Sequence, residues 1–526
     1  MTAPLTFGQA PTAGALYYGD CLDWMSKWDS GIVDLIYLDP PFNSKQDYNM
    51  LYSAEVAGDA QYRAFADTWV WDEAAADRYG QFDGQVGGVA RTIRGLYRML
   101  GECGMLAYLT YMAERLEECH RLLKPTGSIY LHCDPTASHY LKVLMDAIFG
   151  ADNFRNEITW KRFNFHADAK RKFGALTDRL LFYGATSAAR QINRVRVPYS
   201  RTYVETKFQR RDESGRRYRL ENLNAPGGRG PVYEFCGITR PWRMTEAKMR
   251  ALDARGRIYK DSRVPQLIRY LDEMPGQAVG DLWADISPIN PRARERLGYP
   301  TQKPVALLDR IIRASSNRGD LVLDPFCGCG TAVDAARSLG RRWIGIDISS
   351  FAVDVMLERL GDKTIPVYGI PYDLHSARRM ATDDPFGFES WAVSRLRGFV
   401  PNTKQVADGG IDGRARLAMQ PDDWKSRLAL AQVKGGKHHP IDGLRAFSSV
   451  VDHRKAALGC YITVEPFDTD SARKVFTSPS KIHVGGYPYR RFNRWSIAEY
   501  FDDRPPLLPP MNNPYTGKPM AQGALF

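Results

Sequence analysis

The chain has 526 residues, of which 44% are hydrophobic and 25% are charged, and its formal net charge is +12. This balance excludes an intrinsically disordered or collagen-like protein, and the length predicts about two or three packed domains. The positive charge favours a polyanionic partner such as nucleic acid, although many basic proteins bind nothing acidic.

The sequence shows no targeting or membrane signal. The N-terminal stretch MTAPLTFGQAPTAG lacks a basic region followed by an apolar run, and no segment reaches the roughly 18 apolar residues that span a bilayer. The eight cysteines form no Cys-x-x-Cys pair. We therefore expect reduced thiols and a cytoplasmic protein that does not contact membranes.

Short apolar runs alternate with helical patterns over the first 190 residues. Residues 31–39 (GIVDLIYLD) and 128–134 (SIYLHCD) predict buried strands, while residues 106–123 and 139–150 predict helices. This alternation is typical of a parallel sheet that is covered by helices on both faces.

The composition changes between about residues 185 and 291. Residues 207–219 are dense in arginine with interleaved aromatic side chains, and residues 225–231 (APGGRGP) predict a flexible loop. After this insert, residues 321–324 and 342–349 predict two more strands, which are separated by a turn and a helix.

The turn from Asp324 to Thr331 (DPFCGCGT) contains glycine at positions 328 and 330, which allows a tight bend and the close approach of a ligand. Such a turn lies at the carboxyl edge of a parallel sheet, where nucleosides bind. Asp347 ends the next strand and can accept both ribose hydroxyls of an adenosine. Because Val333 stands where a dinucleotide loop has its third glycine, the pattern favours a cofactor without a pyrophosphate. The alternative is a purely structural turn.

Asp39, Pro40, Pro41 and Phe42 follow the strand over residues 31–39. An exocyclic amine is a poor nucleophile because its lone pair is delocalised into the ring. A carboxylate and a backbone carbonyl that accept its two N–H bonds pull the nitrogen toward tetrahedral geometry, and the prolines hold the carbonyl of Pro40 in place. Phe42 offers a stacking face for a flipped base. The alternative is a Pro-Pro turn that ends a strand, with Asp39 at the surface.

Together these segments resemble the DNA amino-methyltransferases, in the permuted order of the beta class. In that class the catalytic turn comes first, the recognition region second and the loop that binds S-adenosylmethionine (AdoMet) third. The resemblance covers roughly residues 15–360 and includes residues 18–25, 127–150, 156–162 and 298–312. It implies a doubly wound α/β AdoMet-dependent methyltransferase sheet, circularly permuted, with an inserted target-recognition domain.

The resemblance also implies the site residues. The catalytic residues would be Asp39, Pro40, Pro41 and Phe42. Asp20 would contact the adenine of AdoMet, and Thr301 to Lys303 would close over it. The complete cofactor set would be Asp20, Thr301, Gln302, Lys303, Asp324, Phe326, Gly328, Gly330, Thr331 and Asp347. An Asp at the first catalytic position favours N6 of adenine; members with Ser there usually act on N4 of cytosine, which remains the alternative.

The basic insert takes the position of the recognition domain in this family, so double-stranded DNA is the expected partner. Five arginines are candidates for contacts with phosphates or guanine edges, namely Arg210, Arg211, Arg216, Arg217 and Arg219. Three aromatic side chains either stack on bases or pack internally: Tyr218, Tyr233 and Trp242. The alternative for the arginines is a solvated face. Members of this class often pair, so a homodimer is a further expectation.

A second pattern occupies the C-terminal region, where residues 388–399 predict a helix and residues 428–437 and 460–465 predict strands. It resembles the catalytic core of Mrr-like restriction endonucleases, which are relatives of the PD-(D/E)xK nucleases. The resemblance implies that Asp412 holds Mg²⁺, that Gln432 orients or shares the metal, and that Lys434 stabilises the attacked phosphate or activates water. Glu389 would add a carboxylate. Gln432 replaces an acid, which weakens the expected metal affinity, and the alternative is a DNA-binding or degenerate nuclease domain.

The expected domains are a catalytic part over residues 15–190, a recognition region over 191–295, an AdoMet-binding part over 296–365 and an α/β endonuclease-like domain over 384–500. The leading hypothesis is a DNA adenine methyltransferase with an attached restriction activity. The alternatives are an N4-cytosine methyltransferase, an endonuclease with a companion methylase half, and a DNA-binding protein in which both centres are inactive. The proline-rich tail after Arg504 is expected to be extended or disordered.

Overall fold

The structure is a computed structural model of the chain. It describes residues 10–41, 69–163, 173–189, 192–290, 292–297, 299, 301–362, 364–402, 410–418, 427–436, 441–466, 481–512 and 519–520. The chain divides into two compact units, one made of Met1–Asn193 with Asp281–Phe526 and the other of Arg194–Gly280. No helix among the described residues is both long enough and apolar enough to cross a bilayer.

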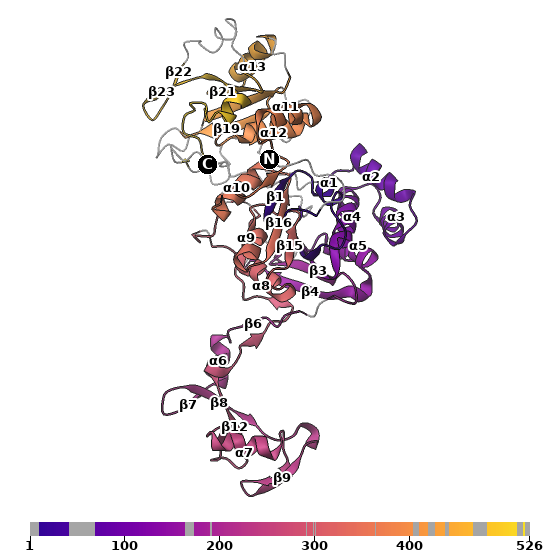
Figure 1. Cartoon of the computed structure of the whole chain (residues 1–526), viewed down its shortest axis with the longest axis vertical. Coiled ribbons are helices and arrows are strands. Elements are labelled where there is room, and N and C mark those ends of the chain that lie inside the picture. Colours follow the sequence, from indigo (N-terminus) through magenta and orange to yellow (C-terminus); the bar gives the residue numbers. More distant parts are fainter. Residues whose placement is uncertain are drawn as a thin grey trace. The chain divides into compact units, whose positions relative to one another are not determined.

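A nine-stranded sheet forms the centre of the first unit among the described residues (Figure 1). At the middle of this sheet the strands are buried along their whole length, because helices cover both faces of the sheet. In spatial order they are β14 (Leu282–Trp283), β4 (Phe154–Lys161), β5 (Thr177–Gly184), β3 (Leu123–Cys133), β2 (Val33–Leu38), β15 (Leu321–Asp324), β16 (Arg342–Asp347), β1 (Ala15–Tyr18) and β17 (Val367–Tyr368).

The sheet is mixed, which corrects the expectation of a purely parallel one. Strand β5 runs antiparallel to both of its neighbours, β3 and β4, whereas the remaining neighbours in the sheet are parallel. An antiparallel neighbour needs only a short return of the chain, while a parallel neighbour needs a crossover, usually a helix. The rest of the predicted doubly wound α/β sheet is confirmed.

Two groups of helices cover the sheet, and Figure 1 shows them on opposite sides. The helices that were predicted over residues 106–123 and 139–150 are confirmed as α4 and α5, and both belong to the first group. The first group is α1 (Cys21–Met25), α2 (Glu73–Asp83), α3 (Gly88–Leu100), α4 (Gly104–Leu122) and α5 (Ser138–Phe149). The second group is α8 (Val305–Ser315), α9 (Thr331–Ser338) and α10 (Ser350–Leu360).

The apolar core lies between the first helix group and the sheet. Leu106, Met112 and Leu116 of α4 and Ile36 of β2 are completely buried in it. All eight cysteines are free thiols, as expected. This core holds the strand ends in register, which fixes the positions of the turns that follow them.

The unit Arg194–Gly280 has its own small core around Trp242, which is completely buried and donates its indole N–H to the carbonyl of Tyr233 at 2.8 Å. Trp242 therefore packs internally. Strand β14, which follows this unit in the chain, belongs to the central sheet. The elements are β6 (Arg196–Val197), α6 (Arg201–Lys207), β7 (Arg210–Arg211), β8 (Arg217–Asn222), β9 (Val232–Phe235), β10 (Ile238–Pro241), α7 (Glu246–Ala254), β11 (Ile258–Tyr259), β12 (Gln266–Tyr270) and β13 (Gln277–Ala278).

The C-terminal region contains a five-stranded sheet with the order β18-β19-β20-β21-β24 among the described residues. Strands β20, β21 and β24 are parallel, and β18 and β19 are added in antiparallel fashion. The elements are α11 (Leu374–Asp383), α12 (Pro385–Ser394), β18 (Val400–Pro401), β19 (Gly413–Leu417), β20 (Arg427–Lys434), α13 (Ile441–His453), β21 (Leu458–Thr463), β22 (Lys481–Val484), β23 (Tyr487–Arg490), β24 (Phe492–Ser496) and α15 (Ile497–Phe501).

The tail after Arg504 is only partly as expected. Residues 505–510 have no regular structure, but Met511 is buried and forms an isolated bridge with Leu417 of β19. The burial of one apolar side chain against the sheet is enough to hold this part of an otherwise extended segment.

Candidate functional site

Two turns that are far apart in the sequence meet at the carboxyl edge of the central sheet. Asp39 follows β2 and the Asp324–Thr331 loop follows β15, and these strands are parallel neighbours in which Leu35 lies opposite Val322 and Ile36 opposite Leu323. One cavity is lined by both turns. The topology therefore brings the predicted catalytic turn and the predicted cofactor loop to a single site.

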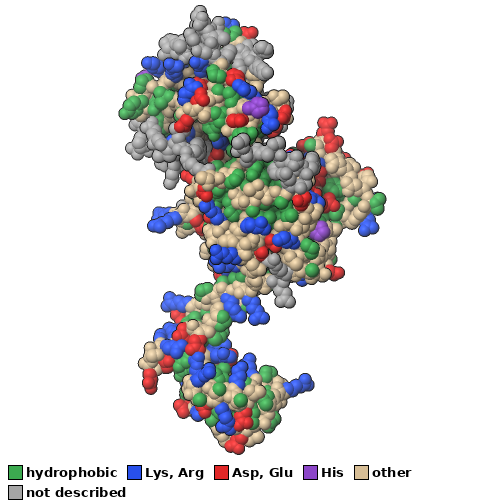
Figure 2. All heavy atoms as spheres, in the orientation of Figure 1, with side chains coloured by type: hydrophobic (Ala, Val, Ile, Leu, Met, Phe, Trp, Pro, Cys, Tyr) green, Lys and Arg blue, Asp and Glu red, His purple; other side chains and the backbone are tan. Residues whose placement is uncertain are grey.

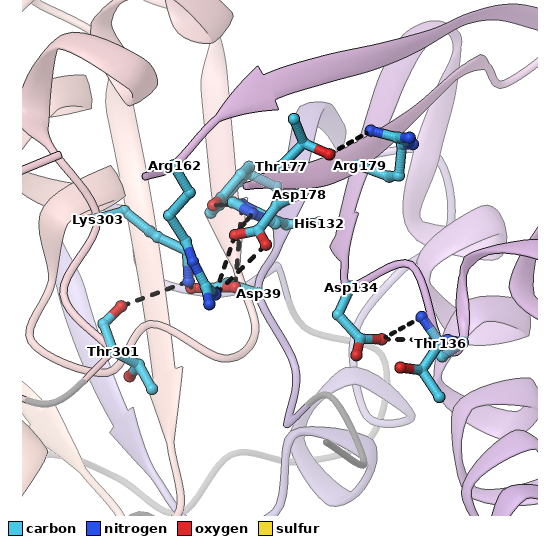
Figure 3. Close-up of polar contacts among 12 residues, drawn as sticks. Asp39, His132, Asp134, Thr136, Arg162, Thr177, Asp178, Arg179, Thr301 and Lys303 are labelled. Carbon is cyan, nitrogen blue, oxygen red and sulfur yellow. Dashed lines mark hydrogen bonds and ion pairs between the residues drawn. The ribbon is translucent and has the colours of Figure 1, made fainter. Parts of the chain in front are cut away.

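Asp39 forms an ion pair with Lys303, whose Nζ lies 2.5 Å from Asp39 Oδ2 (Figure 3). The other carboxylate oxygen, Oδ1, is buried and has no hydrogen-bond partner among the described residues. Buried oxygens without a partner are uncommon, because each carries a desolvation cost. Pro40 and Pro41 also line the cavity. Asp39 Oδ1 is thus an acceptor that is ready for a donor entering the cavity.

The two glycines of the loop are needed for different reasons. Gly328 has φ +49° and donates its N–H to Asp347 Oδ2 at 2.8 Å, and a Cβ there would lie 3.3 Å from the ring of Tyr299 at the cavity wall. Gly330 has φ +75° at the start of α9, and a Cβ there would lie 2.6 Å from Met356 Cγ. Gly328 therefore keeps the cavity open, and Gly330 allows α9 to pack against α10.

Asp347 ends β16 and lines the same cavity. Its Oδ1 accepts the N–H of Ser349 at 2.8 Å, while Oδ2 accepts that of Gly328. Burial raises the pKa of Asp347 to about 6. The group is therefore a carboxylate at neutral pH, and each oxygen keeps a lone pair for a further donor such as a ribose hydroxyl.

The predicted cofactor residues divide into two sets. Those that line the cavity are Asp20, Thr301, Lys303, Phe326, Gly328 and Asp347. The cavity lining does not include Gln302, Asp324, Gly330 and Thr331. The catalytic prediction for Phe42 lies outside the described residues.

The second set shapes the surrounding backbone. Asp324 Oδ1 accepts the N–H of Phe326 at 3.1 Å, and burial raises the pKa of this carboxyl well above its usual range. Gln302 accepts the N–H of Leu297 at 2.8 Å, and the hydroxyl of Thr331 accepts a hydrogen bond from Arg359 at 2.9 Å. These side chains hold the two ends of the cofactor loop and the segment before α8 in place.

Sequence reasoning missed two aromatic residues of the cavity, Tyr111 and Tyr299. The guanidinium of Arg115, which is buried, lies 3.3 Å from the centre of the Tyr111 ring and binds Asp20 Oδ2 at 2.5 Å. Tyr111 and Arg115 are four residues apart on α4, so they share a helix face. The sequence carries no clear signal for Tyr111, because Arg115 is one of several charged residues in the C-terminal half of α4.

The cavity fits AdoMet. A left-handed glycine at 328 leaves the wall free of a Cβ, Asp347 offers acceptors for ribose hydroxyls, and Phe326, Tyr111 and Tyr299 supply apolar surface for a nucleoside.

The predicted DNA-contacting arginines of the insert are not equivalent. Arg216 binds Asp272 at 2.8 Å and also Glu273, whereas Arg210 and Arg211 are exposed. Figure 2 shows Lys and Arg side chains mixed with Asp and Glu on the visible face of this unit. Arg216 therefore stabilises the unit itself, and Arg210 and Arg211 remain accessible to a polyanion.

The second predicted site lies in the C-terminal sheet. Asp412 precedes β19, donates its N–H to the carbonyl of Ala431 at 2.9 Å and accepts the N–H of Val433 at 2.7 Å, which places it beside Gln432. Gln432 is buried, and its Oε1 has no hydrogen-bond partner among the described residues. Lys434 follows two residues later and so shares a face of β20 with Gln432.

Glu389 is half-buried on α12. In the part of the chain that the structure describes, no group of three or more His, Cys, Asp or Glu side chains could hold a metal ion. Two oxygen donors, from Asp412 and Gln432, fit a hard divalent cation that keeps several of its waters.

The sheet and the two turns define an AdoMet-dependent methyltransferase fold with a nuclease-like C-terminal domain. The chain belongs to the DNA methylase family, whose N6_N4_Mtase model matches residues 33–358. A second family model, Mrr_cat, described as a restriction endonuclease, matches residues 381–484. Both predicted resemblances are confirmed.

Similar proteins include two curated type II methyltransferases. M.EcaI of Enterobacter cloacae is 33% identical over 269 residues, which cover 50% of this chain and 59% of that protein. M.BamHI of Bacillus amyloliquefaciens is 26% identical over 350 residues, which cover 66% of this chain and 57% of that protein. The chain thus spans little more than half the length of these relatives.

Among solved structures, the complex of M1.HpyAVI with SAM is 16% identical, covering 66% of this chain and 99% of that chain with a TM-score of 0.32. The cytosine-N4-specific PvuII DNA methyltransferase is 12% identical, covering 68% of this chain and 89% of that chain with a TM-score of 0.34.

Proposed function

We propose that this protein is a DNA methyltransferase that transfers the methyl group of AdoMet to N6 of adenine. The observation that carries the proposal is Asp39 Oδ1, a buried oxygen without a partner among the described residues, in the cavity that Gly328 and Asp347 also line. An acceptor beside a nucleoside-sized pocket is what methylation of an exocyclic amine requires.

The residues of the catalytic turn act on the amine. AdoMet supplies an electrophilic methyl group on a sulfonium. Asp39 Oδ1 accepts one N–H of the amine and the carbonyl of Pro40 accepts the other, which frees the nitrogen lone pair for in-line attack. The ammonium of Lys303 binds Oδ2 at 2.5 Å and so holds the carboxylate in one orientation.

The remaining residues hold the cofactor. Asp347 accepts the ribose hydroxyls, Asp20 contacts the adenine, and Thr301 and Phe326 close the cavity. All four line it. Arg210 and Arg211 of the insert are exposed and bind phosphates of double-stranded DNA.

Two facts support adenine over cytosine as the target. The first catalytic residue is Asp39 rather than Ser. The DNA adenine methyltransferase YhdJ of Escherichia coli is 24% identical over 357 residues, which cover 85% of that protein.

The test is methyl labelling. The full chain is incubated with tritiated AdoMet and unmethylated, PCR-amplified genomic DNA, and the digested nucleosides are separated. We expect label in N6-methyladenine, and none with Asp39→Ala. Label in N4-methylcytosine would overturn the choice of base, and unlabelled DNA would overturn the function.

We also propose that the C-terminal domain cleaves DNA with Mg²⁺. Asp412 would hold the cation together with Gln432 Oε1, which has no hydrogen-bond partner among the described residues, and Lys434 would stabilise the attacked phosphate. Lys434→Ala is expected to abolish Mg²⁺-dependent cleavage of unmethylated DNA, whereas Lys481→Ala, an exposed lysine of β22, leaves it unchanged. Equal cleavage by Lys434→Ala and the wild type would refute this activity.

A further inference from the structure

A buried polar network lies behind the catalytic carboxylate, and the proposed methyl transfer does not yet use it. Its centre is His132 of β3, which is completely buried. His132 Nδ1 lies 2.9 Å from the hydroxyl of Tyr37 and 4.0 Å from Asp39 Oδ1, and Nε2 lies 3.1 Å from Asp178 Oδ2. Figure 3 shows His132 between the carboxylates of Asp39 and Asp178.

Strand geometry builds this arrangement. Tyr37 and Asp39 are two residues apart at the end of β2, so both side chains point to the same face of the sheet. In the strand register, Tyr37 lies opposite Tyr130 of β3, and His132 lies opposite Leu180 of β5. Asp178 is two residues before Leu180 on β5, so its side chain lies on the same face of the sheet. Three adjacent strands thus converge on one imidazole.

The hydrogen bonds define the protonation of the neutral imidazole. Burial raises the pKa of Tyr37 well above its usual value, so the hydroxyl keeps its proton and donates it to Nδ1. Burial also acts to raise the pKa of Asp178, but the hydrogen bond from His132 and the charges of Arg162 and Lys303 act to lower it, and the pKa is lowered. Asp178 is therefore a carboxylate that accepts Nε2–H, and Nδ1 is the basic atom on the side of Asp39.

The charges around His132 come from every neighbouring strand. Two carboxylates flank the ring, and each is balanced by one cation at its far side: Lys303 at 2.5 Å from Asp39 and Arg162 at 3.3 Å from Asp178. The titratable and charged groups that surround the imidazole are Tyr37 and Asp39 from β2, Asp178 from β5, Arg162 after β4, Lys303 before α8 and Asp324 from β15. The imidazole thus lies between two carboxylates, each of which has a cation on its far side.

We propose, on the basis of the proposed methyl transfer, that His132 and Asp178 are positioning residues for Asp39 and that His132 takes up, through Asp39, the proton that the methylated amine releases. His132 lies within 4.0 Å of the carboxylate of Asp39 and 3.1 Å from that of Asp178, and the three residues come from three adjacent strands or their ends.

The proposed step transfers one methyl group and releases one proton. The nitrogen lone pair forms the N–CH₃ bond while the S–CH₃ bond breaks and leaves its electron pair on sulfur. The amine nitrogen, now cationic, loses one proton to Asp39 Oδ1, which passes it to His132 Nδ1. A hydrogen bond is about 2.7–3.2 Å long, so the transfer needs a shift of about 1 Å across the 4.0 Å gap and a rotation of the Tyr37 hydroxyl. The imidazolium returns the proton through Asp39 to water once the products leave.

The test separates proton uptake from simple packing. In His132→Gln, the amide oxygen still accepts from Tyr37 and the amide N–H still donates to Asp178, but the side chain does not take up a proton. Single-turnover methyl transfer is measured from pH 5 to 9 with saturating tritiated AdoMet and PCR-amplified genomic DNA. We expect the wild-type rate to fall toward acid pH, because the proton acceptor of the step must be free before the step. In His132→Gln the rate should drop about 100-fold and this acid limb should vanish.

Two further variants complete the design. Asp178→Asn removes the anionic partner of His132, so it should lower the rate and change the acid limb. His120→Gln changes a half-buried histidine of α4 that lies outside the site, and it should leave both the rate and the pH profile unchanged. The melting temperature and the AdoMet affinity by calorimetry should stay at wild-type values in His132→Gln, which shows that the fold and pocket persist.

A His132→Gln protein that transfers methyl groups at the wild-type rate with the same acid limb would overturn the inference. So would loss of activity that is accompanied by loss of AdoMet binding, because the role would then be structural. Failure of the wild type to label DNA would instead overturn the proposed function, so the two failures are distinguishable.

Discussion

The ion pair between Asp39 and Lys303 allows separate predictions for stability and for activity. Lys303 is 9% exposed and Asp39 is 14% exposed, and their charged atoms are 2.5 Å apart. Removing one partner of a fully buried pair costs about 3–5 kcal/mol, because the other charge stays buried and uncompensated. Since this pair lines a cavity that water can enter, we expect Asp39→Ala to lower the free energy of unfolding by about 2 kcal/mol.

The same substitution removes the acceptor of the amine. Loss of one such preorganised group lowers kcat by about 100- to 1,000-fold or more, while AdoMet still binds through Gly328 and Asp347. Urea denaturation measures the change in the free energy of unfolding, methyl labelling measures the loss of activity, and calorimetry measures the affinity for AdoMet. Full methyl-transfer activity in Asp39→Ala would refute the mechanism.

A double variant tests the ion-pair argument by itself. Replacing Lys303 as well, in Asp39→Ala/Lys303→Met, removes the buried unpaired charge and should restore most of the lost stability without restoring activity. If the double variant is less stable than Asp39→Ala, then the buried charge is not the source of the destabilisation.

Three further predictions concern the loop, the ribose acceptor and the insert. Gly330→Ala places a Cβ at 2.6 Å from Met356 Cγ at φ +75°, and should lower the unfolding free energy by about 2–3 kcal/mol, as measured in urea. The pKa of Asp347 is raised to about 6, so AdoMet affinity by calorimetry should fall as the pH drops through 6, and Asp347→Asn should bind weakly at every pH without that transition. Alanine at Arg210 and Arg211 should flatten the dependence of DNA affinity on salt concentration, and an unchanged slope would exclude both side chains from phosphate contacts.

Most elements that carry the site were predictable from the sequence. Buried strands such as β2 and β15 are continuous apolar runs that end at polar turns, and α4 is a long amphipathic pattern. The direction of β5 was not predictable, because a buried strand has the same apolar residue pattern whether its neighbouring strands are parallel or antiparallel. The pairing of β14 was not predictable either, since its two residues carry too little pattern to show that they join the central sheet.

The residues of the site also divide into those that the sequence indicates and those that it does not. The turn at Asp39 and the loop at Gly328 are recognisable locally, because each needs particular residue types at fixed spacing. His132 and Asp178 were not recognised, since each lies in a segment whose apolar neighbours already explain its burial. Tyr111 was not recognised because it is one of several aromatic and apolar residues of α4. Nothing local marks a histidine that meets a tyrosine and an aspartate from two other strands.

The sequence by itself determined the chemistry of two turns, the family and the order of its parts along the chain, because these depend on residue types that are close together. Only the tertiary structure decided that β2 and β15 are neighbours, that Lys303 reaches Asp39, and that His132 lies between two carboxylates. Those contacts join residues from separate strands and loops, and they depend on strand order and register, which are set by the packing of the whole sheet rather than by any one segment.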